Sequence, residues 1–252
     1  MSIMFPIVFS SLYDNIYNGL YYALTALSLA LLVFSVFVSL RKWGESSAAS
    51  FKGQVLGICL AVVGFAIIIF TGVFLNALSN SGFISEVLYQ RLHFVVFYAS
   101  VALILFGIDA SLMTGGQAFA GARRRYVKAL RAVQWSVFLL TLFLALFYLL
   151  TANINSSGIL PQQPVFFLPL IYVVLAGVVE LPFLALTSRS AYRKSFAWFG
   201  FSMVLILVGA LREATIISLG EPLEDLLLAF VPFTIASFGF YMCAKSLPKF
   251  VP

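Results

Sequence analysis

The sequence predicts an all-α integral membrane protein, a single seven-helix transmembrane domain that takes in residues 1–252. Of the 252 residues, 62% are hydrophobic and only 10% are charged, against about 25% charged in soluble domains. The mean hydropathy is +1.06. One soluble core cannot hide so much apolar surface, so the composition requires a bilayer as solvent. It excludes a cytosolic enzyme, a disordered chain and a nucleic-acid-binding domain.

Seven apolar stretches are each long enough to cross about 30 Å of hydrocarbon. Because lipid offers the backbone no hydrogen bonds, each stretch must be a helix. The expected spans are Tyr17–Leu40, Gln54–Leu78, Val87–Met113, Ala132–Thr151, Val165–Leu186, Ser195–Ser218 and Pro222–Ala244. Small residues at the start of the second span, Gly53, Gly57, Ala61 and then Gly64, form a ridge. Such a ridge favours close helix packing, within the bundle or between protomers.

The basic residues predict the orientation. All 15 Lys and Arg residues except Arg91 and Arg212 fall in the connections after the first, third and fifth spans or in the C-terminal tail. Cytoplasmic loops carry the excess of Lys and Arg, so we expect the N-terminus outside and the C-terminus in the cytoplasm of a plasma or cell membrane. Trp43, Trp135 and Trp198 all fall at the expected inner boundary, as in an aromatic belt.

Charged residues inside spans are costly and are candidates for function. Arg91 and Asp109 of the third span are 18 residues apart. They therefore share a helix face, about 27 Å apart along the axis, with Tyr98 close to the same face. This stripe indicates either a cavity or proton path, or two interfacial charges on a packed helix.

Two further residues within the spans have open interpretations. His93 lies on a different face from Arg91 and is a pH-sensitive switch, a single axial ligand or a hydrogen-bonded packing residue. Glu180 is the deepest carboxylate, about 9 Å inside the expected end of its span. Asp109 and Glu180 either form a carboxylate pair for a proton or cation, or each pairs with a basic residue from the inner connections.

The opposite, outer side carries a polar cluster that suits a ligand site. If the helices close into a ring, Arg91, His93, Arg212, Glu213 and Asp225 converge there above apolar walls, an arrangement typical of binding pockets. The acidic residues of this cluster also have an explanation that needs no ligand. Carboxylates near the start of the seventh span favour the positive end of that helix.

The strongest basic feature is the run Arg123, Arg124, Arg125, Lys128 and Arg131. Arg124, Lys128 and Arg131 share a face if the fourth helix extends inward. The expected contact is anionic lipid headgroups or a partner protein, although the run also simply follows from cytoplasmic topology.

The sequence predicts no catalytic, phosphate-binding or metal-binding site. The chain lacks the sequence motifs of nucleophilic, phosphate-binding and metal sites, and with one His and two Cys no catalytic or metal-ligating residue is proposed. In size, span number and external N-terminus the chain resembles the architecture of microbial rhodopsins. Those proteins carry retinal on a lysine in the middle of the seventh helix. The only lysine of the seventh span region is Lys245, at its inner end, so no cofactor, including covalent retinal, is expected.

Three functions fit these features. The first is a receptor-like or sensory seven-helix module that acts through a partner protein. The second is a small transporter or proton or ion pathway that uses Asp109 and Glu180. The third is a structural subunit of a membrane complex. An enzyme ranks below all three.

The orientation generates a direct test. Because the basic connections lie on one side, a reporter domain fused after Pro252 should be cytoplasmic. We expect a fluorescent protein at this position to fluoresce and an alkaline phosphatase fusion to be inactive. Phosphatase activity from intact cells would contradict the topology.

Overall fold

The computed structural model describes residues 4–46, 49–115, 128–129, 131–133, 135–140, 142–143, 146, 190–216 and 230–248. The regular elements of this part of the chain are all helices: α1 (Met4–Glu45), α2 (Ala49–Asn80), α3 (Glu86–Gly115), α6 (Ser190–Ile216) and α8 (Val231–Ser246). The described residues between 128 and 146, which we call the 128–146 segment, are also helical. The all-α class is confirmed. The number of seven helices stays a prediction, because the expected span Val165–Leu186 lies outside the described residues.

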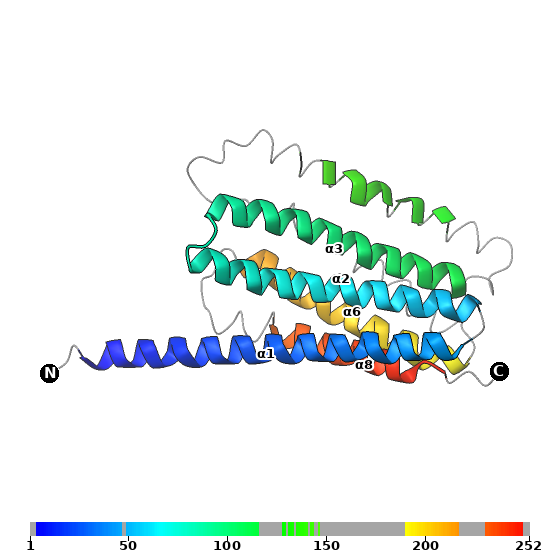
Figure 1. Cartoon of the computed structure of the whole chain (residues 1–252), viewed down its shortest axis with the longest axis horizontal. Helices are drawn as coiled ribbons and strands as arrows, with labels where there is room; N and C mark the ends of the chain where they lie inside the picture. Colours follow the sequence, from blue (N-terminus) through cyan, green and yellow to red (C-terminus); the bar gives the residue numbers. More distant parts are fainter. Residues whose placement is uncertain are drawn as a thin grey trace.

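Three helices are long and apolar enough to cross a membrane, over Ile16–Glu45, Phe51–Ser79 and Arg91–Ala110. They correspond to the first three expected spans. The predicted bounds of α3 agree with the structure within two residues, whereas α1 is much longer than Tyr17–Leu40. Figure 1 shows the N-terminal part of α1 extending past the other helices. The helix can begin this early because Pro6 falls in its first turn, where the missing N–H costs nothing.

The helices pack in four pairs, α1 with α2, α2 with α3, α1 with α8 and α6 with α8 (Figure 1). Contacts between residues fix their directions: α2 runs antiparallel to both α1 and α3, α6 runs antiparallel to α8, and α1 runs parallel to α8. The end of α1, the starts of α2 and α6 and the end of α8 therefore meet at one end of the bundle. We call this the basic end, because it carries Arg41, Lys42, Lys52, Arg193, Lys194 and Lys245.

Aromatic side chains join α2, α6 and α8 at the centre. Phe65 of α2 lies with its ring centroid 5.7 Å from that of Phe233 and 5.8 Å from that of Phe240, both in α8. The ring of Phe199 in α6 is 5.5 Å from Phe240. Phe199 and Phe240 are fully buried. Ring pairs at these separations add to the apolar burial that holds the three helices together.

The small-residue ridge of α2 packs against α3, one of the two arrangements expected from the sequence. A Cβ atom on Gly107 of α3 would lie 2.4 Å from the carbonyl oxygen of Gly57 and 2.6 Å from the nitrogen of Ala61. A Cβ on Gly64 would lie 2.6 Å from the carbonyl oxygen of Ser100. The two backbones approach this closely because no side chain separates them.

Polar contacts tie α1 to α8. The Oγ of Ser28 donates to the Oγ1 of Thr234 at 3.0 Å. At the basic end, the Nζ of Lys42 donates to the carbonyl oxygens of Ala244 at 3.1 Å and Lys245 at 2.8 Å, and also to Leu247. A cation at this place satisfies the last carbonyls of α8 and complements the negative end of its dipole.

The α2–α3 contact predicts which glycine tolerates a methyl group. Gly107→Ala should lower the free energy of unfolding by about 1–3 kcal/mol, because the added Cβ meets backbone atoms that cannot move aside. Gly19→Ala is the matched control, since nothing lies within 4 Å of a Cβ at Gly19. It should be neutral or stabilising by up to about 1 kcal/mol. Reversible unfolding in detergent micelles measures both, and equal effects of the two variants would contradict the close packing.

Candidate functional site

Buried hydroxyl groups in the bundle are largely satisfied by their own helices. Thr25, Ser35, Ser100 and Ser202 each donate to the carbonyl oxygen four residues earlier, at 2.7–3.0 Å. These side chains need no partner on another helix. Asp109 is different. It is the one charged residue that is buried in the part of the chain the structure describes, and an ionised carboxylate cannot be satisfied within its own helix.

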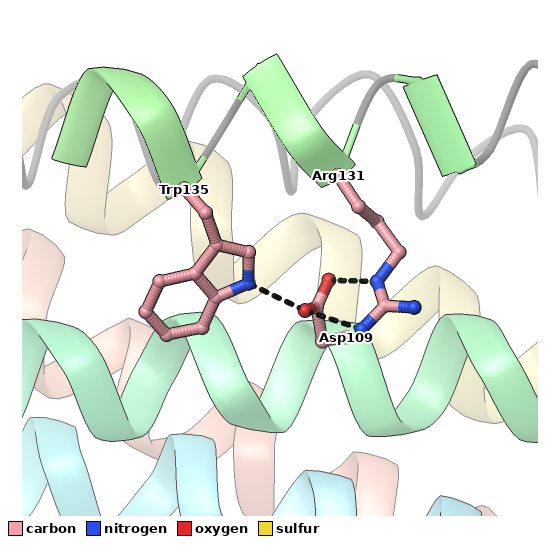
Figure 2. A network of polar contacts seen from close by, with 3 residues as sticks. All are labelled: Asp109, Arg131 and Trp135. Carbon is pink, nitrogen blue, oxygen red and sulfur yellow. Dashed lines mark hydrogen bonds and ion pairs between the residues drawn. The ribbon is translucent and has the colours of Figure 1, made fainter. Parts of the chain in front are cut away.

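The partners of Asp109 come from the 128–146 segment (Figure 2). The Nη2 of Arg131 donates to Oδ2 at 2.8 Å, and the Nε of Arg131 lies 2.8 Å from Oδ1. The Nε contact is an ion pair that is not aligned as a hydrogen bond. The Nε1 of Trp135 donates to Oδ2 at 2.7 Å. The carboxylate thus receives a two-pronged guanidinium contact and an indole hydrogen bond, the kind of charge-assisted contact that is strongest in proteins.

The local sequence presents both donors to α3. Arg131 and Trp135 are four residues apart and therefore lie on one face of a helix. Trp135 is held in place by rings on both sides: its centroid is 4.6 Å from Phe106 and 5.8 Å from Phe138. The side chain of Asp109 is 5% exposed and that of Arg131 is 28% exposed. The carboxylate is therefore buried, whereas part of the Arg131 side chain is exposed.

The remaining candidates on α3 lie apart from this ion pair. Arg91 is exposed at the opposite end of the helix, and Tyr98 is buried, with its ring centroid 6.1 Å from that of Phe138. His93 is half-buried between the rings of Tyr89 and Phe97, at centroid distances of 5.7 and 6.3 Å. Its buried Nδ1 makes no hydrogen bond to a described residue. The structure does not bring these side chains to Asp109.

Several sequence candidates fall outside the described residues: Glu180, Asp225, Arg123, Arg124 and Arg125. The side chains of Arg212 and Glu213 are also outside, although their backbone belongs to α6. That the outer polar residues converge on one site therefore remains a prediction. The carboxylate pair of Asp109 with Glu180 also remains a prediction. Lys128 is exposed, as a lipid-facing or partner-facing residue must be.

In the structure Asp109 pairs with a basic residue, which is one of the two interpretations drawn from the sequence. Two contributions were not recognised from the sequence. The sequence pattern groups Arg131 with its basic neighbours as a lipid or partner contact and places Trp135 in an aromatic belt. Their spacing of four residues, beside a carboxylate that needs donors, was the available signal.

The arrangement joins α3 to the 128–146 segment through charge. No group of three or more His, Cys, Asp or Glu side chains suited to a metal occurs within the described ranges. Comparisons of the chain with protein-family models, with curated proteins and with solved structures give no match.

The ion pair predicts unequal effects of two neighbouring substitutions. Arg131→Gln should lower the free energy of unfolding by about 2 kcal/mol, because it leaves the Asp109 charge buried without its partner. The partial exposure on the Arg131 side reduces the cost of this unpaired charge. Trp135→Phe should cost about 1.5 kcal/mol, the loss of one hydrogen bond to a charged group.

Lys128→Gln is the matched control, because it removes an exposed cation from the same segment. It should change the free energy of unfolding by less than about 0.5 kcal/mol. Chemical unfolding in micelles followed by circular dichroism measures all three variants. Equal effects of Arg131→Gln and Lys128→Gln would show that the pair does not contribute to stability.

Proposed function

We propose that the protein is a receptor-like membrane module in which the Asp109–Arg131 ion pair holds the resting arrangement of the helices. The observation that carries this proposal is the asymmetric burial of the pair, 5% for the Asp109 side chain and 28% for Arg131. A charged pair that water or a partner can reach from one side is a contact that can open. A pair buried on both sides stays closed, because separating it would leave a buried charge without its partner.

The position of the pair supports coupling between two ends of the bundle. Asp109 lies toward the basic end of α3, whereas Arg91 and His93 lie about 24–27 Å away along the same helix. A ligand that binds the outer end and shifts α3 acts on the ion pair through one rigid element. Such a ligand changes the equilibrium only by its difference in affinity for the two arrangements. The output then passes at the basic end to a partner protein.

The topology expected from the sequence belongs to the same proposal: seven spans, an outer N-terminus and a cytoplasmic C-terminus in a plasma or cell membrane. The gathering of Lys and Arg at the basic end supports it. With this orientation Arg131 lies toward the cytoplasmic boundary, where a signalling partner or anionic headgroups are available.

The packing around α3 favours a switch over a transport path. Leu105 lies between Tyr98 and Asp109, within about 40° of their helix face, and it is fully buried. Val101, Ile104 and Ile108 around it are at most 1% exposed. A proton or ion passing along this stripe would have to cross a dry apolar layer. The carboxylate also has its oxygens occupied by Arg131 and Trp135.

Distance measurements between spin labels test the proposal. Lys128→Cys and Lys194→Cys place labels on exposed positions of the 128–146 segment and of α6, while the native Cys59 and Cys243 are buried. In lipid nanodiscs the wild-type background should give one narrow distance distribution. Arg131→Gln should add a second population, because a loss of about 2 kcal/mol shifts a two-state ratio roughly thirtyfold.

Lys245→Gln is the control, since it removes an exposed cation of the basic end that does not touch Asp109. It should leave the distribution unchanged. An unchanged distribution in Arg131→Gln would overturn the switch and leave the pair as a fixed structural contact. Proton flux into wild-type proteoliposomes that Asp109→Asn abolishes would assign the protein to transport instead.

A further inference from the structure

An apolar groove runs along the outside of the bundle between α1 and α2. It has a volume of about 600 Å³ and is lined by aliphatic and phenyl side chains, among them Leu29, Val33, Val36 and Leu40 of α1 and Val63 and Phe70 of α2. Val33 is 65% exposed and Phe70 is 54% exposed. Both linings lie within the stretches that can cross a membrane, so the groove opens toward lipid.

The groove has the length of one leaflet. From Leu29 to Leu40 α1 rises about 16 Å, close to half of the roughly 30 Å of hydrocarbon in a bilayer. This part of α1 is the half nearer the basic end. The groove therefore covers the depth of the acyl chains of one leaflet only, and its head lies at the basic end.

A cationic side chain and an indole lie at this end of the groove. Leu29, Val36 and Trp43 are spaced seven residues apart, so Trp43 continues the groove face of α1. Lys52 precedes Val63 by 11 residues, about three turns, and continues the groove face of α2. The two side chains meet there: the Nζ of Lys52 lies 4.9 Å from the ring centroid of Trp43. Neither salt bridge among the described residues involves Lys52.

We propose that this groove binds one anionic phospholipid, with an acyl chain along α1 and α2 and the phosphate at Lys52. The apolar length matches one chain, the cation stands where the headgroup of that lipid lies, and tryptophan is the residue that favours headgroup depth. A parallel second copy fits less well, because it would bring the same cations of both copies to one depth. This inference goes beyond the proposed function and does not depend on the ion pair of Asp109.

Lipid retention by the full chain tests the site. Protein purified in detergent is titrated with phosphatidylglycerol or phosphatidylcholine of identical acyl chains, and bound lipid is counted by native mass spectrometry. The wild type should bind one phosphatidylglycerol about fivefold more tightly than phosphatidylcholine, the factor expected for one basic residue near the headgroup. Lys52→Gln should remove this preference while chain binding persists.

A substitution that fills the groove tests the acyl-chain contact separately from the headgroup contact. Val33→Trp places a large ring in the groove at an exposed position and should abolish retention of both lipids. Lys194→Gln and Val204→Trp are the matched controls, an exposed lysine and an exposed valine of α6, and both should behave as the wild type. Unchanged selectivity in Lys52→Gln, or unchanged retention in Val33→Trp, would overturn the site. A dimer that Val33→Trp dissociates would assign the groove to a second copy and also overturn it.

Discussion

A buried carboxylate inside a bundle of long apolar helices must find its donors within the chain, and Asp109 imposes this constraint on its surroundings. The side chains of Thr25, Ser100 and Ser202 donate to carbonyl oxygens of their own helices, so they need no partner on another helix. Asp109 requires a cation from another helix, and Arg131 supplies it with the support of Trp135. The position of the 128–146 segment against α3 follows from this requirement.

The rest of the bundle is assembled by contacts that need less specific chemistry. Gly57, Ala61 and Gly64 let α2 approach α3 at backbone distance, and Phe65 reaches the rings of α8. Lys42 caps the carbonyl end of α8 from the end of α1. These contacts form a fixed frame, whereas the Asp109–Arg131 pair joins one further segment to it through charge. In the proposed receptor-like module, these contacts are the part that stays and the 128–146 segment is the part whose attachment changes.

The sequence alone predicted the helical class and the bounds of α3, because long apolar runs in lipid permit one backbone solution. It also predicted that the glycine ridge of α2 packs closely, since small residues every four positions leave a flat surface. The partner of Asp109 could not be chosen in advance. Five basic residues follow the third span within 22 positions of Asp109, and only the packing of the segment selects Arg131. For the same reason Trp135 was assigned to a membrane boundary: an indole suits both a headgroup layer and a buried acceptor.

The coupling energy between Asp109 and Arg131 tests the central claim most directly. A double-mutant cycle with Asp109→Asn, Arg131→Gln and the combined variant isolates the interaction from the other effects of each substitution. If the pair holds the 128–146 segment against α3, the combined variant should be more stable than the sum of the single changes predicts, with a coupling energy of about 1–3 kcal/mol. Additive single effects, within about 0.3 kcal/mol, would contradict the account, because they would mean that the two charges do not depend on each other.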